Sequence, residues 1–140
     1  MSRVAAVIFK DGTFTLLRRQ KNGEHYYVFA GGLVEEGEKL EDALRREIRE
    51  ELGIEITIDR LLFDLVNRGQ DEYYYLVTQW EGDAQLIMDG PEKATIGPSN
   101  TYELAEIELA GLKTINLLPH EARDKVSVLT IYANEESPSK

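Results

Sequence analysis

The sequence predicts a single-domain α/β protein, and three observations support this class. A chain of 140 residues suits one domain with one hydrophobic core. Apolar and β-branched runs typical of strands lie on both sides of a long helical segment at residues 38–52. A second helix is predicted near the C-terminus. We therefore expect a sheet as the scaffold, with the domain at residues 1–133 and a frayed polar tail at 134–140.

Two strands joined by a tight hairpin are predicted at the N-terminus. Residues 3–9 are apolar and β-branched, an Asp-Gly pair at 11–12 is a two-residue hairpin signal, and residues 13–19 return as the partner strand. A second turn signal at 21–24 leads into an aromatic strand at 26–29. This third strand ends next to a pair of glycines.

The glycine pair, Gly31 and Gly32, is expected to form a turn in front of the helix. Glycine lets the backbone come close to an ion or a phosphate, where any side chain would block the approach. A plain β-turn without a ligand is the alternative interpretation.

The helix is predicted to begin near Glu38 or Lys39, without a Ser or Thr cap, and to end at Gly53. A strand at 54–58 should follow at once, because apolar residues alternate there. Two further strands, at 61–67 and 73–80, are predicted to form a hairpin across residues 68–71. A long loop covers 81–101, a returning strand covers 102–109, and a closing helix opens with Pro119 at its first position and turns Ala122, Val126 and Leu129 inward.

Charge and composition exclude several classes of function. The chain has 16 Lys and Arg against 26 Asp and Glu, a net charge of -10, which disfavours polymeric nucleic acid and anionic membranes as partners. The absence of cysteine excludes disulfides and thiolate metal sites. The apolar run at residues 4–9 is too short for a signal sequence or a membrane span. We expect a soluble, cytoplasmic protein, and leave open whether it forms a homodimer.

The long helix carries an unusual arrangement of acids. On a helical wheel its apolar residues form one stripe, and three glutamates share that face: Glu47, Glu50 and Glu51. The remaining charged residues lie on the opposite or flanking arc: Glu38, Glu41, Asp42, Arg45, Arg46 and Arg49. A solvated helix with i,i+4 ion pairs would explain the second group only.

Inward-facing carboxylates one helical turn apart repel each other and resist desolvation unless a cation neutralises them. Magnesium binds carboxylate oxygen and keeps part of its coordination shell for water and phosphate. The turn therefore predicts a metal platform for a phosphorylated substrate.

The same stretch resembles the Nudix box, G-x5-E-x7-R-E-U-x-E-E-x-G-U with U aliphatic, at every fixed position. The matching residues are Gly32, Glu38, Arg46, Glu47, Ile48, Glu50, Glu51, Gly53 and Ile54. One departure is Ala30, where the family usually has proline before the two glycines. Alanine takes the same extended conformation but does not fix φ as proline would.

The resemblance implies an α/β/α sandwich around a mixed sheet, and a Mg²⁺-dependent hydrolase in which Mn²⁺ can substitute. By position, Glu50, Glu51 and the carbonyl of Gly31 would be metal ligands. Glu47 would bind metal or act as general base toward water. Arg46 and Glu38 would orient the Glu47 carboxylate.

Other site residues follow from the resemblance with alternatives left open. Glu92 in the long loop is the first candidate for a further acidic group of the site, and Glu103 is the second. The alternative is that such a loop acid is simply exposed to solvent. Arg19 would contact a substrate phosphate; the alternative is an ordinary surface arginine. Gly32 would contact the substrate. His120 beside Pro119 would reach the base-binding side, although a lone histidine has many structural uses.

The resemblance thus implies a pyrophosphohydrolase that cleaves a nucleoside diphosphate linked to another moiety. A nucleoside triphosphate, normal or oxidised, is the favoured small-molecule substrate, but no downstream signature selects one. The alternative is a Nudix-fold module that binds nucleotides without hydrolysing them. A non-catalytic module has no need of three inward carboxylates, which cost stability when metal is absent.

Overall fold

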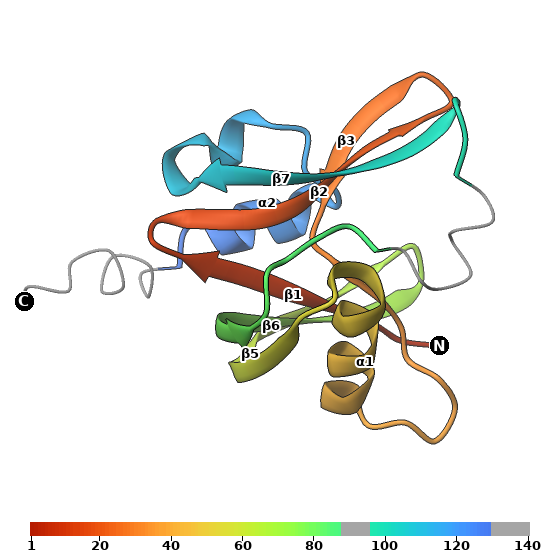
Figure 1. The fold of residues 1–140 in the computed structure, drawn as a ribbon, viewed down its shortest axis with the longest axis vertical. Coiled ribbons are helices and arrows are strands. Elements are labelled where there is room, and N and C mark those ends of the chain that lie inside the picture. The colour runs from red at the N-terminus through yellow and green to blue at the C-terminus, as the bar shows by residue number, and fades with distance from the viewer. Residues whose placement is uncertain (88–95, 130–140) are drawn as a thin grey trace, which may run out of the picture.

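The computed structural model describes residues 1–87 and 96–129 and confirms the α/β/α sandwich. A mixed sheet of seven strands lies between helix α1 (Leu40–Leu52) and helix α2 (His120–Ser127) (Figure 1). In the described part of the chain, neither helix is long and apolar enough to cross a membrane.

The strands follow the predicted order along the chain. Their bounds are β1 Arg3–Lys10, β2 Thr13–Lys21, β3 Glu24–Val28, β4 Gly31–Leu33, β5 Glu55–Asn67, β6 Gln70–Glu81 and β7 Asn100–Glu108, with a short 3₁₀ helix, η2, at Leu109–Thr114. The main path through the sheet is β3-β2-β1-β6-β5, with β4 added to β1 and β7 added to β2. Among the strand pairs of residues 1–87 and 96–129, only β1–β6 is parallel.

The predicted hairpins are confirmed, and each uses a two-residue turn with positive φ at both residues. The turns lie at 11–12, 22–23 and 68–69, with φ between 51° and 84°. This is the geometry of type I′ turns, whose twist matches that of the flanking strands. The third turn, Arg68-Gly69, is two residues shorter than the predicted 68–71 connection, because Gln70 already begins β6.

Two other predicted boundaries are wrong. The strands predicted at 54–58 and 61–67 are one strand, β5, whose pairing with β6 contains register shifts. These irregularities break the alternation of apolar residues, so that a single bent strand resembles two. Pro119 is the N-cap of α2 and not its first helical residue, although Ala122 and Val126 are buried as predicted.

The sheet has a separate apolar core on each face. Successive residues of β1 alternate between them, with Val4, Ala6 and Ile8 facing α1 and the intervening residues facing α2. Such alternation is the period-2 pattern of a strand that is buried on both faces. Both helices are therefore held against the middle of the sheet.

β1 and β2 separate along their length, and this separation positions the site. They pair only next to their hairpin, between Ile8–Lys10 and Thr13–Thr15. Beyond that point β1 pairs with β4, whereas β2 pairs with β3 and β7. Figure 1 shows β2, β3 and β7 diverging from β1, β5 and β6. The cavities described below are lined by residues from both groups of strands.

Candidate functional site

Gly31 and Gly32 lie in the short strand β4, so the prediction of a glycine turn is wrong. They pair with Ala5 and Val4 of β1. A Cβ atom added to Gly31 would lie 2.0 Å from the carbonyl oxygen of Val4, and one added to Gly32 would lie 2.2 Å from the carboxylate carbon of Glu47. Glycine is needed here because a strand and a carboxylate pack directly against the backbone.

Helix α1 points two of its three predicted carboxylates into the protein. Glu47 and Glu51 are 7% and 6% exposed, and Glu51 accepts a hydrogen bond from the N–H of Gly31 at 3.0 Å. Glu50 is less buried than predicted, with 35% of its side chain exposed. The helix ends at Gly53, whose φ of 70° is the predicted left-handed terminus.

Arg46 supplies a cationic partner that the helical wheel placed on the solvent side. Its Nη1 donates to Oε1 of Glu47 at 3.0 Å and to Oε1 of Glu50 at 3.4 Å. Its Nε and Nη2 donate to the two oxygens of Glu38, at 2.8 and 2.9 Å. The outward prediction for Arg46 is wrong because a long side chain can reach around the helix to a neighbouring face.

Arg46 and Glu38 form an ion pair with two hydrogen bonds. These hydrogen bonds hold the pKa of Glu38 at about 2, well below the usual range. The same bonds, with those to Glu47, raise the pKa of Arg46. Glu38 is thus a fixed anion that holds Arg46 beside Glu47 at neutral pH.

The donor set suits a hard divalent cation. Three carboxylates on one turn of α1 border the cavity that Gly31 and Gly32 also line. Among the described residues, no three acidic or histidine side chains are already gathered around a common point. Mg²⁺ does not require such a closed cage, because in phosphate sites it takes one or two carboxylates together with water and phosphate oxygens.

This cavity, which we call the helix-side cavity, has a volume of about 600 Å³. Arg19 of β2 also lines this cavity and is held in place by aromatic rings. Its guanidinium lies 3.6 Å from the ring centre of Tyr102 and 5.6 Å from that of Tyr26. It also donates to the carbonyl of Thr101 at 3.3 Å and to the side chain of Asn100. Arg19 therefore lies in the site, where its planar fork suits a phosphate.

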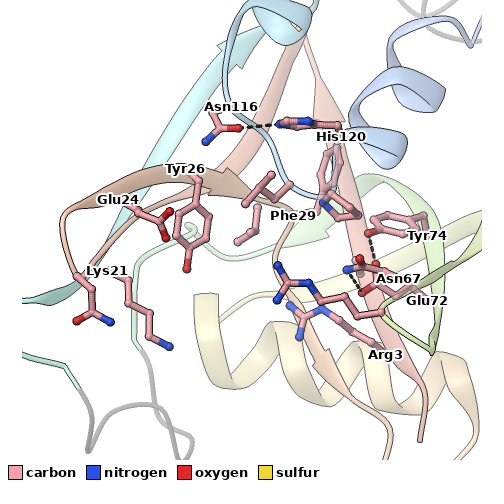
Figure 2. A pocket seen from close by; sticks show the side chains of 16 residues that line it. Arg3, Lys21, Glu24, Tyr26, Phe29, Asn67, Glu72, Tyr74, Asn116 and His120 are labelled. Atoms are coloured by element: carbon pink, nitrogen blue, oxygen red, sulfur yellow. Dashed lines mark hydrogen bonds between the residues drawn. The ribbon is translucent and has the colours of Figure 1, made fainter.

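A second cavity of about 660 Å³ adjoins the first, and we call it the inter-sheet cavity. Arg3 and Val28 line both cavities. Figure 2 shows its walls, with Tyr26 on one side and Glu72 and Tyr74 on the other. His120 also lines it, at the start of α2, and its Nε2 is 2.8 Å from Oδ1 of Asn116.

Comparison with known proteins assigns the family. A model of the NUDIX domain matches residues 1–129. The chain belongs to the NUDIX family. Five of the box residues that carried the sequence resemblance border the helix-side cavity: Gly32, Arg46, Glu47, Glu50 and Glu51. The matched region covers every described element of the fold.

Solved structures of other proteins share this fold over nearly the whole chain. The solution structure of the Escherichia coli ORF135 protein has a TM-score of 0.74 at 25% identity, covering 94% of this chain and 90% of that one. A MutT structure from work on the Aliivibrio salmonicida and Vibrio cholerae proteins has a TM-score of 0.70 at 25% identity, covering 94% and 97%.

Curated relatives match over a shorter stretch. A CTP pyrophosphohydrolase of Escherichia coli K12 is 49% identical over 57 residues, which are 39% of this chain and 42% of that protein. An 8-oxo-dGTP diphosphatase of Proteus vulgaris is 36% identical over 62 residues, 41% of this chain and 55% of that protein. The chain thus spans about half the length of the curated relatives it matches.

The two candidates for a loop carboxylate have different outcomes. Glu92 lies outside the described residues. Glu103 of β7 points away from the helix-side cavity and pairs with Arg18 at 3.7 Å, with 66% of its side chain exposed. Neighbouring residues of a strand face opposite sides, so Glu103 is turned away by the same alternation that turns Tyr102 inward.

Sequence reasoning missed several residues that line the two cavities. Arg3, Tyr26, Glu72 and Tyr102 come from four strands that are distant in the sequence. Only Glu72 carried a detectable signal, because an acid directly before the apolar run of β6 is rarely buried unless it has partners.

Proposed function

We propose that this NUDIX chain is a divalent-metal-dependent pyrophosphohydrolase that cleaves a nucleoside diphosphate linked to another moiety. A nucleoside triphosphate, normal or oxidised, is the favoured substrate. The observation that carries the proposal is the helix-side cavity, which is lined by both the α1 carboxylates and the cation of Arg19. Such a cavity matches a metal-bound pyrophosphate, which presents positive charge to the acids and negative charge to the arginine.

The roles that we propose for these residues are those that the family resemblance implies, and the contacts of Arg46 support them. Glu50, Glu51 and the Gly31 carbonyl would hold Mg²⁺ or Mn²⁺, with Glu47 as a further ligand. When bound, such an ion neutralises phosphate charge and lowers the pKa of a bound water. Glu47 would take the proton of the attacking water, and Arg46, itself fixed by Glu38, would hold its carboxylate in position.

The nucleoside would extend into the inter-sheet cavity. That cavity adjoins the helix-side cavity through Arg3 and Val28, and its volume lies within the usual range for small-molecule sites. Arg19 contacts Tyr26 of the inter-sheet cavity as well as Tyr102 of the helix-side cavity. A phosphate bound at Arg19 would therefore lie between the metal platform and the nucleoside.

A second candidate is a NUDIX module that binds nucleotides without hydrolysing them. The hydrolase is favoured because Glu47 is buried and oriented by Arg46, an arrangement that binding alone does not require. The names of the relatives, a CTP pyrophosphohydrolase and an 8-oxo-dGTP diphosphatase, support the same choice.

Turnover of a nucleotide panel tests the proposal. The panel contains normal and oxidised nucleoside triphosphates, ADP-ribose and dinucleoside polyphosphates, each with Mg²⁺, Mn²⁺ or EDTA. We expect metal-dependent release of pyrophosphate or phosphate from at least one nucleoside triphosphate. Tight binding of nucleotides with no product under any metal condition would favour the binding module.

Metal binding should also be visible in thermal stability, without any substrate. A ligand at a concentration of about 100 times its dissociation constant adds about 2.7 kcal/mol to the free energy of unfolding. Mg²⁺ should therefore raise the melting temperature of the wild type by several degrees. Glu50→Gln should melt at or slightly above the metal-free wild type, because it removes one repelling charge, and should gain less from Mg²⁺. Monovalent salt at matched ionic strength is the control, and equal Mg²⁺ shifts in both proteins would place the metal elsewhere.

A further inference from the structure

The inter-sheet cavity contains a buried acid that the proposed chemistry does not use. Glu72 of β6 is 4% exposed and lines this cavity. Its Oε1 accepts a hydrogen bond from the hydroxyl of Tyr74 at 2.7 Å, and its Oε2 accepts one from Nδ2 of Asn67 at 3.1 Å. Figure 2 shows both bonds on the cavity wall, next to Arg3. The carboxylate is thus fixed in orientation.

The partners of Glu72 do not use all of its hydrogen-bonding capacity. An ionised carboxylate offers about four lone-pair positions, and neutral donors take two of them here. Within residues 1–87 and 96–129, no cationic side chain lies within ion-pair distance of Glu72. A buried carboxylate costs free energy unless donors satisfy it. A ligand that brings N–H donors into the cavity would supply them.

The rest of the wall suits a planar ring. Tyr26 faces Glu72 across the cavity, and Phe29 and Tyr74 contribute apolar surface. Burial, with the hydrogen bond to Glu72, raises the pKa of Tyr74 well above its usual range. The Tyr74 hydroxyl therefore stays a donor to Glu72 and leaves the carboxylate as the acceptor that a ligand would meet.

Nucleobases differ in what they present to such an acceptor. Cytosine, adenine and guanine carry an exocyclic amino group, and in guanine a ring N–H lies beside it. Uracil and thymine carry one ring N–H between two carbonyl oxygens, which a carboxylate repels. Carboxylates that read bases accept from the amino group in the same way.

We propose that Glu72 is a specificity-determining residue that accepts a hydrogen bond from the exocyclic amino group of the substrate base. The chain then favours amino-bearing nucleotides over those of uracil and thymine. This inference rests on the proposed function, since it requires the nucleoside to occupy the inter-sheet cavity.

The test compares kcat/KM for CTP and UTP in the wild type with Mg²⁺. CTP carries an amino group at C4 of the base, whereas UTP carries a carbonyl oxygen there and an N–H at the neighbouring N3. We expect at least about a tenfold preference for CTP, because a site built to pair with a donor rejects an analogue that lacks it. Glu72→Gln should reduce or reverse the preference, since its amide can donate to the uracil carbonyl, and should change KM more than kcat. Equal kcat/KM for CTP and UTP in the wild type would overturn the inference, whether or not the variant folds.

Two further variants separate recognition from structure. Asp71→Asn removes one charge from the neighbouring, exposed position of the same strand and should leave the CTP:UTP ratio unchanged. Tyr74→Phe removes one donor to Glu72 but keeps the carboxylate, so CTP should remain preferred. A Glu72→Gln protein with a wild-type melting curve and a wild-type CTP:UTP ratio would contradict the assignment.

Failure of this inference can be distinguished from failure of the proposed function. If the wild type turns over no nucleotide, the hydrolase proposal fails, and calorimetric dissociation constants for CTP and UTP then decide the inference alone. A lower dissociation constant for CTP that depends on Glu72 would support it. Equal constants would refute it.

Discussion

Glu51→Gln is expected to lower kcat by several orders of magnitude while leaving the fold intact. Glu51 accepts the Gly31 N–H at 3.0 Å, and the amide oxygen of glutamine can accept the same bond. The amide cannot supply the anionic oxygen that a hard divalent ion needs. The measurement is steady-state kinetics on the best nucleotide of the panel, with circular dichroism to confirm the fold.

A matched control is available on the same helix. Glu41→Gln changes the same side chain on the exposed face of α1, where Glu41 pairs with Arg45 at 3.4 Å, and should leave kcat close to wild type. Exposed ion pairs of this kind contribute little to stability. Wild-type turnover in Glu51→Gln, with a matching melting curve, would remove Glu51 from the metal site.

The elements that the sequence predicted well are those set by local geometry. Type I′ turns require positive φ at two adjacent residues, which Asp-Gly and Asn-Gly pairs adopt readily, so these pairs predict the first two hairpins. Gly53 ends α1 because its φ of 70° is costly for other residues. The inward position of Glu47 and Glu51 follows from the period of the helix, because Cβ directions repeat every 3.6 residues.

The features that the sequence did not predict depend on contacts between distant strands. The helical wheel gives the direction in which Arg46 leaves the helix, but not the position of its guanidinium, which is set by Glu38 and by the carbonyl of Leu33 in β4. The inter-sheet cavity likewise depends on where β1 and β2 separate. No local sequence pattern predicts where the two strands separate, because the register of each strand depends on the strand with which it pairs.

The close contacts of Gly31 and Gly32 predict that substitutions at these positions have large effects. Gly31→Ala is expected to unfold the protein or lower its melting temperature by roughly 10 °C or more. The new Cβ would lie 2.0 Å from the carbonyl oxygen of Val4 and 2.8 Å from Cα of Ala5. Both are backbone atoms of β1, so the clash can be relieved only by separating β4 from the sheet. The measurement is a thermal scan followed by circular dichroism.

Gly32→Ala, one residue further along the same strand, should separate folding from catalysis. Its Cβ would meet the carboxylate of Glu47, with the nearest atom at 2.2 Å. A carboxylate at the end of a flexible side chain can move aside at low cost, so the fold should persist. Glu47 would then leave the position in which Arg46 holds it, and kcat should fall strongly, since small displacements of a catalytic group are costly.

Gly111→Ala provides the control for the substitution itself, because its Cβ would meet only Ile107, at an ordinary contact distance of 3.6 Å. It should retain both stability and activity. The expected order of melting temperatures places Gly31→Ala far below the other two proteins, while only Gly111→Ala keeps its kcat. A Gly32→Ala protein with normal kcat would show that the position of the Glu47 carboxylate does not limit the reaction, and the general-base role would then have to be assigned to another acid.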